Sequence, residues 1–551
     1  MRVGLIVVTL LAAASSVFAQ QPGAEAPDAI FYNGKVVTVD SGFSIQQAFA
    51  VKGDQFVAVG TTAAIRALAG KNTRQVDLKG STVIPGLSDN HDHMYAVAKV
   101  MRGGVNMVGV ATSAQLLERL KPAIAKAEPG QVVYTTAGWS IDALPSLKEL
   151  DAVTGNVPVF LVRHRRAHGM VNSAALKLAG ITRENPTYAG LPVPRDANGN
   201  FTGDVPAYPA SITLMDQLIA PPTPQQEEQM LVKAMAERNA RGITSVRELA
   251  LWPGWMRAYF RLHEQGKLTL RISASVDLPD PAKTIQEMRE WGVGPGFGDH
   301  WLRIDSNAEE PWPPSTPLSK FIEIAVEANR LDWRLAPHTA ADPNRGIPDA
   351  ETVNDVLQAF EAADHDHSIK DKRWLMEHVP YITPEQMDRA KNLGVILSIQ
   401  DMGWYGGYDA LVKSVGKEQA ERETPLREIL DHHLMAVAGS DYRGPEFNDP
   451  NPSNPFKIFY YFVTRKTIEG RTLDPREKIT REEALRLFTV NSAYATFEEN
   501  VKGPIQAGML ADFVVLNQDL MTVPDEKIRA TKPLATYVGG KKVYSAPGSK
   551  F

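Results

Sequence analysis

The middle of the chain alternates short apolar segments with longer stretches of helical periodicity, and this alternation constrains the fold more than any other feature. It is typical of repeated βα units, whose strands join one parallel sheet. Eight strands are the number that closes into a (β/α)8, TIM-like barrel, so this α/β fold is the expected class. The eight candidate strands are 83–87 running on to 91, 242–248, 270–275, 301–305, 334–338, 374–378, 395–400 and 435–441.

Both ends of the chain show a β-rich pattern instead. Short alternating segments fill residues 29–82, and two more lie at 511–516 and 535–544. Asn33 with Gly34, and Gly53 with Asp54, are turn pairs typical of hairpins. We therefore expect the two ends of the chain to build one small β-sandwich.

These patterns predict three regions and one insertion. Residues 1–19 are expected to be a signal peptide, and residues 20–84 with 505–551 to form the composite β-sandwich. Residues 85–504 are expected to form the barrel, with a large insertion after its first strand at about 105–235.

The first residues resemble an export signal. Met1 and Arg2 give a basic start, residues 3–14 are apolar, and small residues precede an expected cleavage after Ala19. The apolar stretch is too short to span a bilayer, so the mature protein is expected to be periplasmic or secreted and free of the membrane. The alternative is an N-terminal membrane anchor.

Charge and cysteine content narrow the chemistry. A formal net charge of -5 gives no basic face for nucleic acid. The absence of cysteine excludes a disulfide framework, thiolate metal ligands and a cysteine nucleophile. A small-molecule substrate is expected, a homo-oligomer is compatible with the sequence, and any metal must be held by His, Asp, Glu or Lys.

The first candidate strand ends in His91-Asp-His93. Strand side chains repeat every second residue, so the two imidazoles share one face and present two nitrogen donors to one cation. The sequence has 12 histidines, and a second such pair, His365 and His367, stands in a charged setting. That second pair is interpreted as part of a solvated loop after a helix.

Three later strands also end in polar residues that suit a metal site: His338, His378 and Asp441. The carboxyl ends of barrel strands meet at one face, so these groups are expected to converge on His91 and His93. Zn²⁺ or a similar ion bound there activates water and polarises a carbonyl. Asp441 then accepts the proton of the water and delivers it to the leaving nitrogen. Ser440 lacks the elbow motif of a nucleophile.

With these residues the chain resembles the amidohydrolase superfamily of metal-dependent hydrolases, and its amidohydrolase family 3 branch most closely. The resemblance implies a (β/α)8 barrel beside a β-sandwich, hydrolysis of C–N bonds, and metal ligands at His91, His93, His338, His378 and Asp441. The segments that carry it are 83–93, 171–176, 242–246, His338, 377–378, 439–441, 490–495 and 507–516.

The fourth strand departs from the resemblance. Where the family usually has a lysine able to bridge two metals, the chain reads Leu302-Arg303-Ile304. Arginine cannot form the bridging carbamate, so one divalent ion is expected, Zn²⁺ before Mn²⁺ or Fe²⁺, and a second is doubtful. Asp305 shares a face with Arg303 and is expected either to act as a ligand or to pair with it.

With one metal, His378 either completes its ligand shell or hydrogen-bonds the water. Four residues are candidates for binding substrate: His168 and Trp139 in the insertion, and Arg303 and Asp305 on the fourth strand. For His168 and Trp139 a packing role is the alternative. Glu309 and Glu310 follow the fourth strand, where a solvated acidic loop is expected and selection of a cationic group is the alternative.

The first functional hypothesis is an exported hydrolase cleaving an amide or another C–N bond of a small molecule. The same site also suits an esterase, a lactonase or a deaminase. Because Arg303 stands where the family usually has a lysine, a third hypothesis is a catalytically inactive barrel that serves as a binding protein.

Overall fold

The computed structural model describes the chain from residue 25 onward, with short gaps. It leaves out residues 1–24, 137, 140–143, 163–168, 189–190, 206–209, 279, 313–315, 341–348, 401–407, 443 and 445–452. The expected signal peptide and its cleavage point lie outside the described residues.

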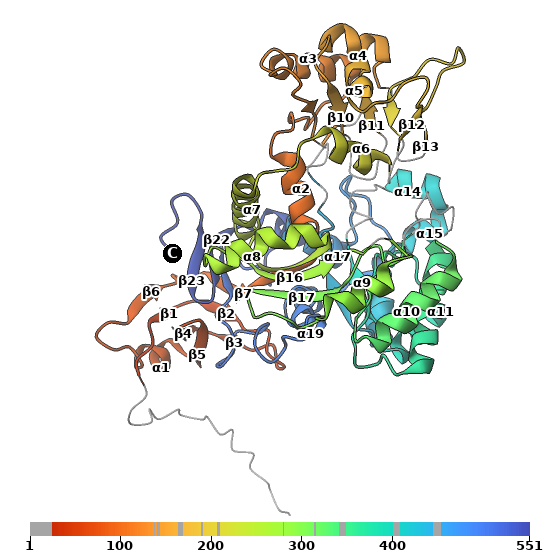
Figure 1. Cartoon of the computed structure of the whole chain (residues 1–551). Helices are drawn as coiled ribbons and strands as arrows, with labels where there is room; N and C mark the ends of the chain where they lie inside the picture. The colour runs from red at the N-terminus through yellow and green to blue at the C-terminus, as the bar shows by residue number, and fades with distance from the viewer. Residues whose placement is uncertain are drawn as a thin grey trace, which may run out of the picture.

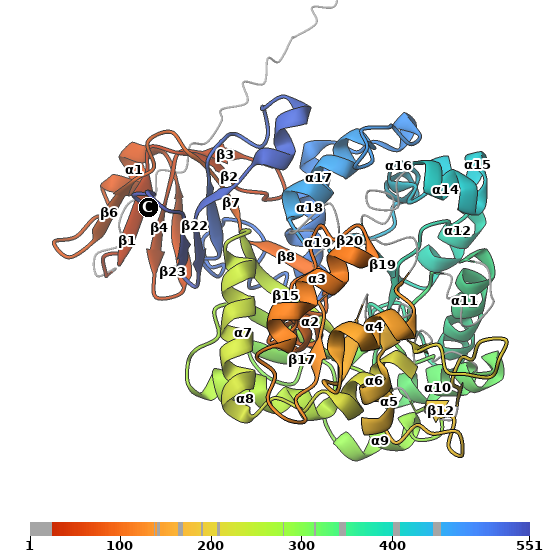
Figure 2. The same cartoon turned by 90° about the horizontal axis from the view of Figure 1, so that it is seen from above.

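The two ends of the chain build two facing sheets. The smaller sheet has the order β5-β4-β1-β6, and the larger has the order β23-β22-β21-β7-β2-β3. Figure 2 shows the N-terminal strands beside β22 and β23 on one side of the molecule. A core of aromatic side chains, among them Phe31, Phe49, Phe513 and Tyr537, joins the two sheets. The elements are β1 (Ala29–Tyr32), β2 (Lys35–Val37), β3 (Ile45–Gln46), β4 (Ala48–Lys52), β5 (Gln55–Gly60), α1 (Thr62–Arg66), β6 (Arg74–Asp77), β7 (Thr82–Pro85), β21 (Phe513–Leu516), β22 (Pro533–Val538) and β23 (Lys541–Ser545).

One of the two expected hairpins is confirmed and the other is wrong. Gly53 and Asp54 connect the antiparallel strands β4 and β5. Asn33 does adopt the left-handed conformation of a turn, with φ 58°, but β1 and β2 do not pair with each other. They belong to different sheets, so the turn at Asn33 carries the chain from one sheet to the other.

The middle of the chain forms two parallel sheets, which confirms the α/β class. One has the order β17-β16-β15-β8 and the other the order β18-β19-β20. Single backbone bridges connect their flanks: Asn307 to Leu335, His338 to Glu377, and Asp92 to Tyr442. The strands are β8 (Leu87–Asp92), β15 (Ile243–Leu251), β16 (Arg271–Val276), β17 (Leu302–Asn307), β18 (Leu375–Glu377), β19 (Ile396–Ile399) and β20 (Ala436–Ala438). The expected strand at 334–338 is present only as these bridging residues.

The expected first strand is in fact two strands. β7 pairs with β21 in the terminal sheet, while β8 pairs with β15 in the parallel sheet. The break falls at Gly86, where an added Cβ would lie 2.2 Å from Oγ1 of Thr244. Only glycine allows the chain to pass this close as it leaves one sheet for the other.

Helices cover the parallel strands (Figure 1). Two of them, α7 and α12, begin with the same sequence signal: a threonine N-cap, a proline at the first turn and a glutamine that completes a capping box. Their bounds are α2 (Met94–Met101), α7 (Pro224–Asn239), α8 (Met256–Glu264), α9 (Thr284–Trp291), α10 (Leu318–Arg330), α11 (Asp349–Asp366), α12 (Pro384–Asn392), α14 (Tyr408–Val415), α15 (Lys417–Glu421), α16 (Leu426–Asp431), α17 (Pro455–Thr464), α18 (Arg481–Leu487) and α19 (Val490–Ala495), with short 3-10 turns at Pro253–Trp255, Pro475–Glu477 and Asp525–Ala530.

The segment between α2 and α7 has its own sheet, of order β14-β11-β10-β9, and its own hydrophobic cores. Figure 1 shows it grouped at one end of the molecule. Its elements are α3 (Ser113–Ile124), β9 (Val133–Tyr134), α4 (Leu147–Thr154), β10 (Val159–Leu161), β11 (Gly169–Val171), α5 (Ser173–Leu178), β12 (Thr187–Tyr188), β13 (Leu191–Pro192), β14 (Asp204–Val205) and α6 (Ala210–Leu218).

In the part of the chain that the structure describes, no helix has the length and apolar content needed to cross a bilayer. His365 lies in the last turn of α11, and both it and His367 are exposed. The second histidine pair is therefore solvated, as the sequence predicts, but His365 belongs to the helix and not to a loop after it.

Candidate metal centre

Five side chains expected from the sequence lie together at the carboxyl ends of the parallel strands. His91 is on β8, and His93 follows it at the start of α2. His338 bridges to the end of β18, His378 follows β18, and Asp441 follows β20. All four imidazoles are buried, His338 being the most exposed at 6%.

Distances within the cluster suit ligands of a shared cation. Nε2 of His93, His91 and His378 lie 3.2, 3.5 and 3.7 Å from the carboxylate of Asp441. Two ligands of one tetrahedral zinc ion, each about 2.0–2.1 Å from it, are about 3.3 Å apart. The prediction that these residues converge is therefore met by their positions.

A sixth residue, Glu309, stands at the centre of the cluster and was assigned wrongly. One of its oxygens, Oε1, lies 2.6 Å from Nδ1 of His338 and 3.0 Å from Nε2 of His378. The other, Oε2, lies 3.5 Å from Nε2 of His93. Glu309 is 2% exposed and two residues beyond β17, so it is a buried member of the site and not part of a solvated acidic loop.

The donor atoms form three groups that could hold an ion: His91, His378 and Asp441; His91, His93 and Glu309; and Glu309, His338 and His378. Within each group the donor atoms all lie within 4.8 Å of one another. Imidazole and carboxylate are donors that zinc, manganese and iron accept.

The hydrogen bonding of the two ring nitrogens of His91 shows whether this residue could bind a metal. Its Nδ1 lies 2.7 Å from Oε2 of Glu377. Burial alone would raise the pKa of Glu377, but the charge of Arg247 and the hydrogen bonds from His91 and Ser398 hold that pKa at about 2. An ionised carboxylate only accepts hydrogen bonds, so Nδ1 carries the proton and Nε2 has the lone pair. Nε2 is buried and accepts no hydrogen bond from any residue that the structure describes, as a ligand atom requires.

The backbone at the ends of β18 and β20 is turned toward the cluster. His378 and Asp441 have φ values of 56° and 47°, in the left-handed region that only a supporting structure maintains in residues other than glycine. The amide of His378 donates to Ser398 O at 3.1 Å, and that of Asp441 donates to His91 O at 2.7 Å.

Asp89 ties the first strand to the last. It accepts hydrogen bonds from the amide of Ser440 at 2.8 Å and from its hydroxyl at 2.6 Å. Burial and the charge of Asp92 raise the pKa of Asp89 to about 7, although the two hydrogen bonds from Ser440 lower it. The hydroxyl of Ser440 is thus engaged with Asp89, which agrees with its rejection as a nucleophile.

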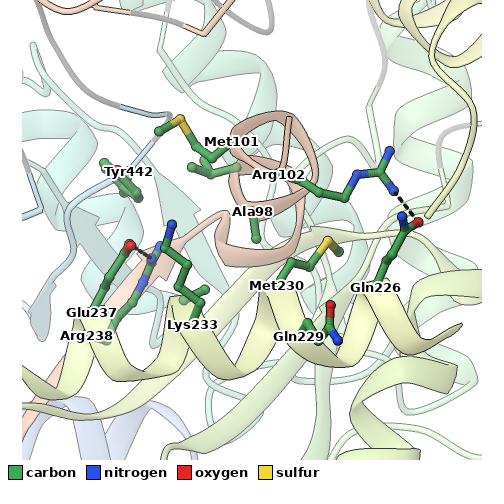
Figure 3. A pocket seen from close by; sticks show the side chains of 12 residues that line it. Ala98, Met101, Arg102, Gln226, Gln229, Met230, Lys233, Glu237, Arg238 and Tyr442 are labelled. Carbon is green, nitrogen blue, oxygen red and sulfur yellow. Dashed lines mark hydrogen bonds and ion pairs between the residues drawn. The ribbon is translucent and has the colours of Figure 1, made fainter. Parts of the chain in front are cut away.

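A cavity of about 370 Å³ lies between α2 and α7 and is also lined by Tyr442, the residue after Asp441 (Figure 3). Arg238 on its wall donates two hydrogen bonds of 2.8 Å to Asp92, the residue between His91 and His93. The guanidinium also lies 4.8 Å from the ring centroid of Tyr442. None of the six clustered residues lines this cavity.

Arg303 and Asp305 lie outside the groups of possible ligands, and they do not pair with each other. Arg303 stands at the amino end of β17, opposite the cluster, and its closest acidic partner is Glu498 at 3.8 Å. Asp305 pairs with Arg247 at 2.7 Å and Arg334 at 3.1 Å. Burial opposes ionisation of Asp305, but these two cations hold its pKa well below the usual range. Asp305 belongs to none of the three ligand groups.

The two candidates from the insertion have different outcomes. Trp139 is 4% exposed in a hydrophobic core, and its indole N–H donates to Val162 O at 3.1 Å. Trp139 therefore has the packing role that was predicted as the alternative to substrate binding. His168 lies outside the described residues.

Replacing Gly439 by alanine is expected to disturb this centre. The added Cβ would lie 2.6 Å from both N and Cβ of His91, so the strand end or the histidine must move. A ligand displaced by about 1 Å can cost about 100-fold in rate. Steady-state kinetics and metal content of Gly439→Ala measure the effect. The matched control is Gly254→Ala, whose Cβ would meet nothing within 4 Å; equal losses in both variants would contradict the prediction.

The fold is that of solved metal-dependent hydrolases. An uncharacterised metal-dependent hydrolase from Pyrococcus horikoshii superimposes with a TM-score of 0.70 at 19% identity, covering 90% of this chain and 99% of that one. The zinc complex of an atrazine chlorohydrolase from Arthrobacter aurescens gives a TM-score of 0.55 at 14% identity, covering 94% and 95% of the two chains.

The chain belongs to the amidohydrolase family, whose model matches residues 74–544. Among curated proteins it is 27% identical to the N-substituted formamide deformylase of Arthrobacter pascens, over 95% of this chain and 99% of that protein. It is 25% identical to the protein LONG AFTER FAR-RED 3 of Arabidopsis thaliana, over 95% and 92% of the two chains. The predicted family is confirmed, and with it the assignment of the chain as an amidohydrolase enzyme.

Proposed function

We propose that the protein is an exported, metal-dependent hydrolase that cleaves an amide or another C–N bond of a small molecule. The observation that carries this proposal is the buried cluster of four imidazoles and two carboxylates at one end of the parallel strands. Nε2 of His91 adds a buried ligand atom that forms no hydrogen bond with any residue that the structure describes.

The residues proposed to hold the metal are His91, His93, His338, His378, Asp441 and Glu309. A divalent ion bound there activates water and polarises the scissile carbonyl. Zn²⁺ is the first candidate, with Mn²⁺ and Fe²⁺ as alternatives.

The position of Glu309 bears on how many ions the centre could hold. The expectation of a single ion rested on Arg303, which lies at the other end of β17. Glu309 instead belongs to two ligand groups, one with His91 and His93 and the other with His338 and His378. We propose that these groups would let the centre hold a second ion beside the first.

Asp441 is proposed as the general acid and base. Its carboxylate lies 3.2 to 3.7 Å from Nε2 of three imidazoles, where it would be within reach of a water held by a metal bound to them. It would accept a proton from that water as the C–O bond forms, and would deliver the proton to the leaving nitrogen as the C–N bond then breaks. His378, 3.7 Å away, is placed to hydrogen-bond the same water when it is not a ligand.

The proposed substrate is a small N-acyl amine, because the family cleaves such bonds and a relative spanning nearly the whole chain is a formamide deformylase. Hydrolysis of an ester or a lactone, or hydrolytic removal of an amino group by a deaminase, would use the same groups. The inactive-barrel alternative rested on Arg303 and loses its motivation, since that residue does not contact the cluster.

The structural setting of this function is proposed as well. The two parallel sheets are taken as arcs of one (β/α)8 barrel over 85–504, because backbone bridges connect their flanks. Residues 20–84 with 505–551 form the β-sandwich, and the insertion spans about 105–235. Export rests on the sequence of residues 1–19, and the partner is a small molecule and not nucleic acid or membrane.

Metal removal tests the proposal directly. Protein purified with zinc or manganese is expected to hold stoichiometric metal and to hydrolyse at least one member of a panel of N-formyl amines, N-acyl amino acids, cyclic amides and aryl esters. Chelation is expected to lower that rate by about 100-fold or more, and added metal to restore it. Absence of bound metal, or equal rates for the loaded and stripped protein on every member, would refute the hydrolase assignment for these bonds.

A further inference from the structure

A layer of buried charges lies directly behind the metal centre. Arg247, Asp305, Arg334 and Glu377 are at most 4% exposed. Barrel interiors are usually filled by branched apolar side chains, and burying charges costs free energy unless they are well paired. Two cations and two anions here balance one another, but apolar residues would fill the same space at no such cost. Stability alone therefore does not explain why this layer is charged, and we look for a functional explanation.

The charges are connected in one chain that ends on a metal-site histidine. Arg334 donates to Asp305 at 3.1 Å, and Arg247 donates to the same carboxylate at 2.7 Å. Arg247 also donates to Oε1 of Glu377, and Oε2 of Glu377 lies 2.7 Å from Nδ1 of His91. Arg247 is further fixed by Ser306 Oγ at 3.1 Å. Every link is between buried side chains.

The end of β18 contributes to the centre twice. Glu377 and His378 are neighbours, and side chains of neighbouring strand residues normally point to opposite faces. The left-handed backbone at His378, with φ 56°, breaks this alternation. As a result His378 lies in the ligand cluster while Glu377 contacts a second member of that cluster, His91, from behind.

We propose that Glu377 is a positioning residue that fixes the tautomer and orientation of His91, and that Arg247 anchors Glu377. The carboxylate holds the proton on Nδ1 and leaves Nε2 for the ion. A carboxylate behind a metal-binding histidine strengthens the site, and its loss typically lowers metal affinity 10- to 100-fold. This inference rests on the proposed metal centre, and no substrate contact is assigned to either residue.

Zinc binding by the full-length, metal-stripped protein tests it, measured by competition with a chromophoric chelator. Glu377→Gln keeps the shape of the side chain and removes its charge, so the Kd for zinc is expected to rise about 10- to 100-fold. That variant leaves one excess positive charge in the layer and is expected to unfold at lower temperature. A double variant, Glu377→Gln with Arg247→Gln, restores the charge balance and is expected to be more stable but equally weak in zinc binding.

The control breaks a similar buried pair that does not contact the cluster. Asp512 accepts two hydrogen bonds from Arg271, at 2.6 and 2.9 Å. Asp512→Asn is expected to lower the Tm of the stripped protein while leaving the Kd for zinc unchanged. This separates positioning of a ligand from general stability.

The outcomes separate the inference from the function on which it rests. Failure of the wild-type protein to bind zinc or manganese overturns the metal centre itself. Binding by the wild type, together with a Kd within threefold of it in whichever Glu377 variant is folded, overturns the positioning role and leaves the centre intact. A rise in Kd in the Glu377 variants but not in Asp512→Asn supports the inference.

Discussion

Replacing Glu309 by glutamine is expected to abolish stable metal binding. Carboxylate oxygens of Glu309 lie 2.6, 3.0 and 3.5 Å from ring nitrogens of His338, His378 and His93. Glu309 also belongs to two of the three ligand groups, and its histidine partners in one group differ from those in the other. An amide is a much weaker ligand for a divalent ion than a carboxylate. We expect the affinity for zinc to fall by about 100-fold or more, beyond the effect of losing a supporting residue.

Metal analysis after dialysis measures this loss, together with the Tm difference between loaded and stripped protein. Glu310→Gln is the matched control, because Glu310 is the next residue, is equally buried at 2% exposed, and belongs to none of the ligand groups. Retention of full metal content by Glu309→Gln would show that the centre does not depend on Glu309.

Replacing Asp441 by asparagine is expected to lower kcat by about 10²- to 10⁴-fold, the range that general acid and base catalysis supplies. Asparagine has nearly the same shape but cannot accept the proton of the attacking water. Steady-state kinetics on the best substrate of the panel, with metal content measured on the same sample, separate this loss from loss of the ion.

The neighbouring variant Ser440→Ala distinguishes the proposed role from nucleophilic catalysis by serine. Its hydroxyl donates to Asp89 at 2.6 Å, so its removal is expected to change kcat less than about tenfold. A loss in Ser440→Ala as large as that in Asp441→Asn would contradict the role given to Asp441 and indicate a serine nucleophile.

Sequence patterns were sufficient for the residues that end strands. His91, His93, His338, His378 and Asp441 each follow an apolar segment, and parallel strands bring such residues to one edge. This argument depends only on the class of fold and not on details of register, so it holds although several strand limits were wrong.

Glu309 was missed because its position does depend on those limits. The fourth strand was expected to end at Asp305, but β17 continues to Asn307. That extension carries the next residues into the cluster, where two adjacent glutamates had been assigned to solvent. A signal was present: Glu309 and Glu310 stand between Ala308 and an apolar, proline-rich segment, a poor setting for a solvated acidic loop.

Arg303 illustrates the converse error. The prediction assumed that Arg303, because it belongs to the fourth strand, takes the position of the lysine that bridges two metals. The residue lies at the amino end of β17, so its side chain and the centre are at opposite ends of the strand. A single sequence does not show how far along a strand a side chain lies, whereas the pairing of β17 with β16 does.

The pairing of β7 with β21 has a consequence for the order of events during synthesis. β7 leads directly into β8, which carries His91, yet its partner in the terminal sheet begins at Phe513. β2 precedes β7 and can pair with one edge of it early, but a ribosome must complete nearly the whole polypeptide before β21 pairs with the other edge. Such long-range closure is slow and leaves strand edges exposed, so the nascent chain depends on protection from aggregation until its last segment emerges.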